Sequence, residues 1–192
     1  MPSPLTIILI IAALIVVLLV VWFISTMNKL TRANLTVEEA FSGMDIFLKK
    51  RYDLIPNVVA TVKGYAAHEQ ETLEGVIAAR NQAVSAPAGS EQAAAAEKNF
   101  EGAISRLFAI AESYPNLKAD AQFLDLQRQL SSIEDDIAQS RKYFSGAVKK
   151  YNELVQMFPS SIVAGICGRK TRAFYEVSSE EQRENVTVDF SK

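Results

Sequence analysis

An unbroken apolar run near the start of the chain restricts the fold more than any other feature. Residues 5–24, LTIILIIAALIVVLLVVWFI, contain no charged side chain, and Thr6 carries their only hydroxyl. In a helix, about 20 residues rise about 30 Å, which is the thickness of the hydrocarbon core of a bilayer. Trp22 and Phe23 close the run, at the depth where aromatic residues gather in membrane proteins. We therefore expect a transmembrane helix over residues 5–26 that places the chain in a lipid bilayer.

A cleaved signal peptide is the alternative for this run. The four preceding residues, MPSP, carry no Lys or Arg. The run also exceeds the apolar core of a signal peptide, about 7–15 residues, and no A-x-A cleavage site follows. We interpret it as a retained anchor. Lys29 and Arg32 follow it closely, which favours a cytoplasmic location for the rest of the chain and a short extracytoplasmic N-terminus at residues 1–4.

The composition excludes several classes of protein. Lys and Arg number 20 against 22 Asp and Glu, without a dense basic block, which disfavours nucleic-acid binding. Only 8 Gly and 6 Pro are present, few for a turn-rich β protein. Cys167 is the single cysteine, so an internal disulfide is excluded.

Apolar residues beyond the anchor recur in alternating steps of four and three, which predicts heptad-like helices. The first series runs from Val37 to Ala79 and stops at SAPAGS, 85–90; a capping box at Thr36 to Glu39 favours a helix start at Thr36. One unbroken helix from the membrane is the alternative. Two further series occupy 93–114 and 123–158, each followed by a proline, and Asp120 or Asn116 is expected to cap the last helix.

These series predict an all-α fold, with a transmembrane helix followed by an antiparallel bundle of three long helices and a short C-terminal helical segment. The expected regions are a juxtamembrane linker at 27–35, a bundle at 36–176 and a flexible tail at 177–192 that includes a second capping box at Ser178. The middle helix is too short to cover its neighbours. Their uncovered ends are expected to pair with each other, with the tail or with another subunit, which favours a homo-oligomer or a membrane-protein partner.

Three alternating helices would place residue 158 far from the membrane. We therefore expect the small, apolar segment after it to close the distal end of the bundle, with a membrane-surface segment as the alternative. The residues expected to form this distal interface are Ile162, Val163, Ile166, Arg169 and Lys170.

The stretch RYDLIPNVV at 51–59 places polar residues and a proline within the first apolar series. Arg51 falls on the apolar seam, where an unpaired guanidinium would be costly to bury. Pro56 removes a helical hydrogen bond, and Asp53 or Asn57 is expected to satisfy the freed groups. We interpret Arg51, Asp53, Pro56 and Asn57 as a structural kink that fixes bend and register. A partner-docking site is the alternative.

Residue patterns typical of catalysis are missing from the sequence. It contains no phosphate-binding glycine loop, no metal-ligand spacing and no nucleophile paired with a base. The acidic trio Glu134, Asp135 and Asp136 is interpreted as a solvated helix face. We therefore expect no enzyme activity, no cofactor, no metal and no small-molecule substrate.

Three stretches resemble the LemA family of bacterial membrane-anchored proteins. They are RYDLIPNVVATVKGYAAHEQETLEGVIAARNQA, ISRLFAIAESYPNLKAD and FLDLQRQLSSIEDDIAQSRKYFSGAVKKYNELVQMFPSSIVAGICGRK. Ser140 and the pair Phe144-Ser145 depart from the family pattern, which commonly has alanine and Tyr-Asn there. These departures bear on fine packing and leave the resemblance intact.

The resemblance implies an antiparallel bundle of long helices behind a single span of the bacterial inner membrane, without an assigned catalytic activity or cofactor. It also implies relatives among magnetosome-membrane proteins and an association with a membrane-embedded zinc metalloprotease. We therefore expect a membrane-anchored scaffold or adaptor that acts in envelope quality control. A lipid-contacting, membrane-remodelling protein is the alternative.

Overall fold

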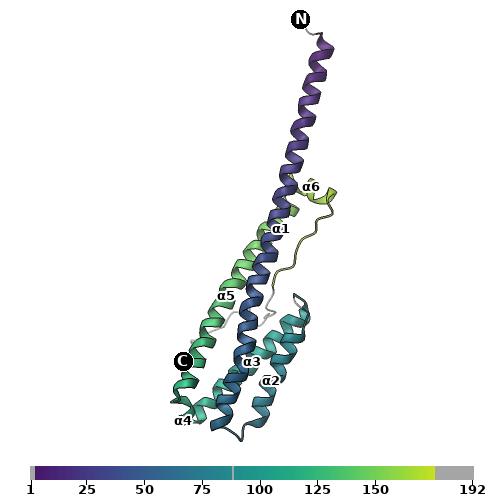
Figure 1. Cartoon of the computed structure of the whole chain (residues 1–192). Coiled ribbons are helices and arrows are strands. Elements are labelled where there is room, and N and C mark those ends of the chain that lie inside the picture. Colours follow the sequence, from purple (N-terminus) through teal and green to yellow (C-terminus); the bar gives the residue numbers. More distant parts are fainter. Residues whose placement is uncertain (1–2, 88, 176–192) are drawn as a thin grey trace, which may run out of the picture. The chain divides into compact units, whose positions relative to one another are not determined.

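The computed structural model describes residues 3–87 and 89–175, and every regular element within them is a helix (Figure 1). This confirms the predicted all-α fold. The helices are α1 (Pro4–Tyr65), α2 (Gln70–Ser85), α3 (Glu91–Ser113), α4 (Pro115–Lys118), α5 (Ala121–Gln156) and α6 (Ser160–Ile166). The expected tail at 177–192, with its capping box at Ser178, lies outside the described residues.

Helix α1 runs without interruption from the apolar segment into the rest of the chain, over 62 residues. Residues 27–35, expected as a linker, are helical, and the alternative of one unbroken helix is therefore the one observed. The Thr36 hydroxyl donates to the carbonyl of Arg32 at 3.1 Å instead of capping a new helix. Among the described residues, α1 is the helix that is long and apolar enough to cross a membrane.

The first apolar series contains a chain reversal that its periodicity did not predict. Helix α1 ends at Tyr65, four residues turn the chain, and α2 begins at Gln70. The turn is held by bonds from the Ala66 amide to the Val62 carbonyl, 2.8 Å, and from the Glu69 amide to the Ala66 carbonyl, 3.1 Å. The expectation of one helix from Thr36 to the break at 85–90 is therefore wrong.

The described chain divides into two compact units, and both α1 and α5 contribute to each of them. The first unit contains residues up to Met44 together with 139–174. The second unit contains residues 45–138 and Tyr175.

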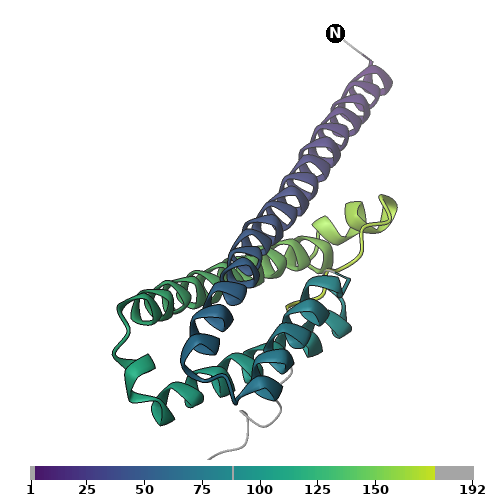
Figure 2. The same ribbon diagram turned by 60° about the horizontal axis from the view of Figure 1, so that its bottom comes forward.

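The second unit is a bundle of four longer helical segments, from α1, α2, α3 and the first part of α5, together with the single-turn helix α4. Helices α2 and α3 lie side by side in opposite directions (Figures 1 and 2). The Ser90 hydroxyl caps α3 by accepting from the Ala93 amide at 3.0 Å. Fully buried apolar side chains from all four segments form one core, among them Val58, Val62, Val76, Leu107 and Phe123.

In the first unit, the part of α1 that ends at Met44 packs against the part of α5 that begins at Gln139. The rings of Phe41 and Phe144 lie 5.7 Å apart, and Leu30 packs in a cluster with Leu154. The earlier residue of α1, Leu30, packs in one cluster with the later residue of α5, Leu154, so the two helices run antiparallel. The sequence predicts that the uncovered helix ends pair with each other, with the tail or with another subunit. Among the described residues, the first of these arrangements is observed, because the ends of α1 and α5 pack against each other.

The extra reversal also returns the end of α5 to the apolar part of α1. Val163 and Ala164 of α6 are buried in one cluster with Leu30 of α1, and Trp22 and Phe23 pack against this cluster. The predicted position of this segment at the distal end of the bundle is therefore wrong. The reason is that α2 is one antiparallel helix more than the sequence predicts. Every helix after it therefore runs in the direction opposite to the predicted one.

Asp120 caps α5 and is one of the two caps, Asp120 or Asn116, that the sequence leaves open. Its carboxylate accepts from the Phe123 amide at 2.8 Å and from the Tyr65 hydroxyl at 2.9 Å. These two donors hold the pKa of Asp120 below its ordinary value. The same carboxylate therefore starts α5 and links it to the end of α1.

Replacing Asp120 with alanine should lower the melting temperature of the chain most strongly near neutral pH. A carboxyl with a lowered folded-state pKa stabilises the fold above its unfolded pKa, about 3.9. That stabilisation is lost as the pH falls through the lower, folded-state pKa. The melting temperatures of wild type and Asp120→Ala, measured by circular dichroism across this range, should converge in acid. A difference that stays constant with pH would contradict this expectation.

Candidate functional site

Arg51 is the most unusual residue of the second unit because its charged side chain is completely buried. It lies on the apolar seam of α1, and its exposed fraction is 0%. Its Nη2 donates to the Glu97 carboxylate of α3. Its Nη1 donates to both oxygens of Glu134 on α5, at 3.0 and 3.3 Å. One guanidinium thus links three helices of the bundle.

Two aromatic rings and a further carboxylate complete the surroundings of Arg51. The Phe100 ring centroid lies 5.2 Å from the guanidinium carbon, within the range of a cation–π contact. The Tyr52 hydroxyl donates to the other oxygen of Glu97. Glu101 lies 3.8 Å from Nη1 and is more exposed. Within the described residues, Nε of Arg51 is buried without a hydrogen-bond partner.

The electrostatics of this cluster favour a fixed charge state. Burial disfavours the charged guanidinium, but attraction by Glu97 and Glu134 outweighs it and holds the pKa of Arg51 above its ordinary value. Burial and the hydrogen bond to Glu97 raise the pKa of Tyr52. Tyr52 therefore remains a hydrogen-bond donor at neutral pH and does not act as a base. The arrangement suits a structural clamp better than proton transfer.

The partners of Arg51 were not identified from the sequence. The sequence predicts a solvated face for Glu134, and the structure corrects this, because Glu134 accepts hydrogen bonds from the buried guanidinium of Arg51. Glu97 follows an alanine-rich run and shows no pattern of its own. The signal that was available is Arg51 itself, because an arginine on an apolar seam requires a carboxylate from another helix.

Pro56 creates a second polar contact between helices. Because proline has no amide N–H, the carbonyl of Tyr52 loses its usual helical donor. The Arg80 side chain of α2 supplies one instead, with Nε 2.9 Å from that oxygen. Arg80 also lies 3.7 Å from the Asp53 carboxylate. The expectation that Asp53 or Asn57 satisfies the freed carbonyl is therefore wrong.

The four residues of the predicted kink thus do not form one site. Arg51 points into the core, whereas Asp53, Pro56 and Asn57 are exposed. The Asn57 carbonyl accepts from the Thr61 hydroxyl at 2.9 Å within α1. Helix α1 continues through Pro56 to Tyr65.

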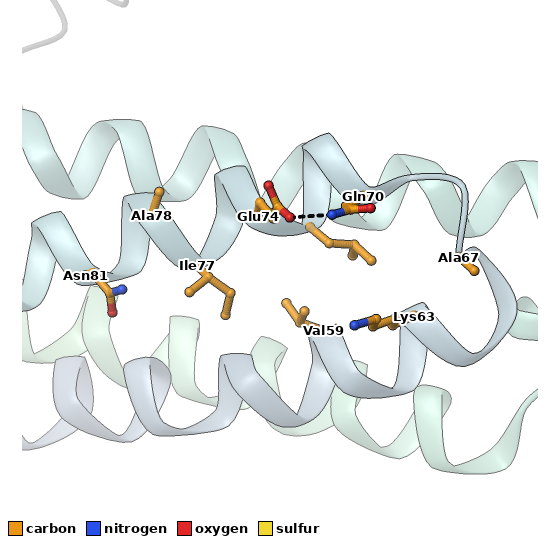
Figure 3. Close-up of a pocket in the computed structure, with 9 residues that line it drawn as sticks. Val59, Lys63, Ala67, Gln70, Glu74, Ile77, Ala78 and Asn81 are labelled. Atoms are coloured by element: carbon orange, nitrogen blue, oxygen red, sulfur yellow. Dashed lines mark hydrogen bonds between the residues drawn. The ribbon is translucent and has the colours of Figure 1, made fainter.

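An apolar groove lies between α1 and α2 in the same unit (Figure 3). Its volume is about 470 Å³. Val59 of α1 and Ile77 of α2 point into it, and Lys63 lies beside them (Figure 3). Gln70 donates to Glu74 at 2.7 Å on the opposite side. The groove is open to solvent and combines an apolar floor with one charge of each sign.

The residues expected at a distal interface lie on α6 and in the segment that follows it, and they differ in exposure. Val163 is buried against α1, whereas Ile162 and Ile166 are exposed by 50% and 68%. Arg169 Nη2 lies 3.4 Å from the hydroxyl of Thr31, and Lys170 is exposed. These residues lie beside the apolar part of α1, in the first unit.

Across residues 3–87 and 89–175, no three His, Cys, Asp or Glu side chains lie close enough together to hold a metal ion.

Comparisons with known proteins place these features in a family. The family model described as LemA family matches residues 40–190. The magnetosome protein MamQ of Magnetospirillum gryphiswaldense is 24% identical over 188 residues, covering 83% of this chain and 69% of its own. Magnetosome protein MamQ 2 of Paramagnetospirillum magneticum is 24% identical over 189 residues, with 83% and 70% covered. Protein LemA of Metamycoplasma hominis is 22% identical over 170 residues, with 88% and 76% covered.

Proposed function

The chain belongs to the LemA family, and from this premise we propose that it is a non-enzymatic adaptor, anchored in the bacterial inner membrane, that binds a membrane-protein partner. The anchor is the apolar part of α1. The binding surface is the groove between α1 and α2. The bundle faces the cytoplasm, because Lys29 and Arg32 follow the apolar segment and positive charge is retained on that side.

The continuity of α1 is the observation that carries this proposal. The apolar segment and the wall of the groove that contains Val59 belong to one helix, Pro4–Tyr65. A partner bound in the groove would therefore be held by the same element that crosses the membrane. An adaptor requires such a connection between its anchor and its binding surface.

The Arg51 cluster supports a role in binding because it fixes the bundle that builds the groove. Breaking a buried charge pair leaves an uncompensated charge, so helices joined in this way have one strongly preferred register. Arg51 is on α1, one of the two groove helices. Arg80, which bonds the Tyr52 carbonyl of α1, is on α2, the other groove helix.

The chemistry of the groove favours an amphipathic helix as its occupant. Apolar grooves between helices take helices whose anchor residues recur every three or four positions. The apolar residues in the groove are Val59, Ala67, Leu73, Ile77 and Ala78. Lys63 and Glu74 would select an occupant with complementary charges beside its apolar face. The membrane-embedded zinc metalloprotease that the family resemblance implies is the first partner to test.

Photo-crosslinking of the full chain in bacterial membranes tests the groove. A benzophenone amino acid placed at Asn81, in the groove, should give an adduct with an integral membrane protein. The same group at Glu71, which is exposed on the same helix but outside the groove, should give little adduct.

The mass of the adduct separates the outcomes of this experiment. A mass equal to two chains would assign the groove to a second copy and contradict a separate partner. Equal adduct formation at Asn81 and Glu71, or none at either position, would contradict the groove as a docking surface. Mass spectrometry of the crosslinked band decides whether the partner is the metalloprotease.

A further inference from the structure

Exposed apolar side chains gather around α6 on the side that faces away from α1. Ile162 and Ile166 are four residues apart and therefore share one face of this helix. Phe158, in the turn before it, is 80% exposed, and Met157 is 62% exposed. Val163 and Ala164 occupy the opposite face and are buried against Leu30. The helix thus has one apolar face packed on protein and a second one that is uncovered.

The position of α6 along α1 is fixed by contacts within the first unit. Trp22 and Phe23, the last aromatic residues of the apolar segment, pack against the same cluster as Val163. Beyond α6, the Arg172 guanidinium donates to Asn34 at 2.9 Å and to Glu38 at 3.1 Å. The chain after α6 is therefore held along α1, beginning at the end of its apolar segment.

This position corresponds to the surface of a bilayer. Trp22 and Phe23 end a segment as long as the hydrocarbon core, about 30 Å, so they lie at its boundary. Leu30, on which α6 packs, is seven residues beyond Phe23 and therefore about 10 Å further along the helix at about 1.5 Å per residue. The headgroup layer on each side of the core is about 5–8 Å thick. The cluster on which α6 packs spans this layer, from Trp22 and Phe23 at the boundary to Leu30 just beyond it. Helix α6 is therefore placed within that layer.

Positive charges accompany the uncovered apolar face. Arg169 and Lys170 follow α6 after the two residues Cys167 and Gly168, and Lys29 and Arg32 lie on the adjoining part of α1. Gly168 ends α6 in a left-handed conformation, φ +63°, so that the Arg169 amide bonds the Ala164 carbonyl at 2.9 Å. This turn directs the chain away from α6 at the start of its basic segment. An apolar face beside cations is the pattern of segments that bind anionic lipid surfaces.

We propose that the turn at Met157 and Phe158 and the exposed face of α6 insert into the headgroup region of the bilayer that α1 crosses, with Arg169 and Lys170 contacting anionic lipid headgroups. The segment forms a second membrane contact, which restrains the rotation and tilt of the first unit at the membrane surface. This inference rests on the membrane anchoring in the proposed function but is independent of the groove and its partner.

Depth-dependent quenching of a fluorophore tests this contact in the full chain. In a Cys167→Ser background, single cysteines at Ile162 and Ile166 carry an environment-sensitive dye, and the protein is reconstituted at low density in vesicles of phosphatidylcholine and phosphatidylglycerol. Spin-labelled lipids with the label near the headgroup should quench both dyes. Tyr143 provides the control, because it is 58% exposed in the same unit. Its neighbour Phe144 contacts Phe41, about 25 Å beyond the apolar segment along α1.

The outcomes distinguish lipid contact from the alternatives. Quenching at 162 and 166 that exceeds quenching at 143 several-fold supports the proposal. A dye at 162 that is shielded from water but not quenched by lipid would overturn it in favour of a protein occupant. Equal quenching at all three positions would also overturn it. Flotation of the protein with the vesicles, measured separately, reports on anchoring by α1, so a failure of the proposed anchor is recognised as such.

A change of lipid and salt tests the contribution of the charges. Quenching at 162 should decrease when phosphatidylglycerol is omitted, when salt is raised, and in the double variant Arg169→Gln, Lys170→Gln. Equal quenching under all these conditions would overturn the role given to Arg169 and Lys170.

Discussion

Replacing Glu97 with alanine is expected to lower the free energy of unfolding by about 3–5 kcal/mol, the largest effect we predict for a single substitution in this chain. Glu97 accepts from both Arg51 and Tyr52. Without it, Nη2 of a completely buried guanidinium loses its partner and has no access to water. Denaturant unfolding of the full chain in mild detergent, followed by circular dichroism, measures the loss.

The double variant Arg51→Met, Glu97→Leu should recover most of this stability. Apolar side chains of similar volume avoid the desolvation of both charges, so such replacements of a buried ion pair are often neutral or stabilising. Glu101→Gln is the matched control, since that carboxylate lies 3.8 Å from Arg51 and is 37% exposed. It should change stability by less than about 1 kcal/mol. Equal losses for Glu97→Ala and Glu101→Gln would show that burial does not determine the strength of this cluster.

The sequence was sufficient to predict those parts of the fold that local patterns determine. Apolar positions along the first seam, such as Met44, Ile55, Val58 and Val62, are fully buried. The breaks at 85–90 and near Pro115 and Pro159 lie where helices end. These features depend on side-chain periodicity and on residues that start or stop a helix, which act over a few positions.

The reversal at 66–69 escaped prediction because it preserves the periodicity on both sides of it. Four residues are close to one helical turn, about 3.6 residues, so the apolar spacing continues from Val62 to Val76 across the turn. Gly64, a weak helix former next to the end of α1, was the local sign of a boundary. Missing one reversal inverted the expected direction of the later helices, and with it the position assigned to α6.

The contacts of the candidate site were the least predictable part because they join distant segments. Arg51 required a carboxylate, but 22 acidic residues were available, and the two that serve it directly lie 46 and 83 positions away. The donor for the carbonyl freed by Pro56 is likewise 28 positions away, on a helix that the sequence did not separate from α1. Side-chain pairing of this kind is a property of the packed bundle.

Replacing Arg80 with methionine is expected to cost about 1–3 kcal/mol of stability, because it leaves the Tyr52 carbonyl without its donor. The same substitution in a Pro56→Ala background should cost less. Alanine at position 56 has an amide N–H that can donate to the Tyr52 carbonyl within α1, so that oxygen no longer depends on Arg80. Denaturant unfolding of the four proteins in this double-mutant cycle gives the coupling between Arg80 and Pro56, which we expect to be about 1 kcal/mol or more.

Asp53→Asn separates this carbonyl bond from the nearby ion pair. Asp53 is 62% exposed and 3.7 Å from Arg80, so its substitution should change stability by less than about 1 kcal/mol. If Asp53→Asn reproduced the loss seen in Arg80→Met, or if Pro56→Ala left that loss unchanged, Arg80 would be acting through its charge. The expected coupling would show instead that Arg80 replaces the hydrogen-bond donor that Pro56 lacks. In that role, Arg80 helps α1 to continue through the proline as one helix from the apolar segment into the bundle.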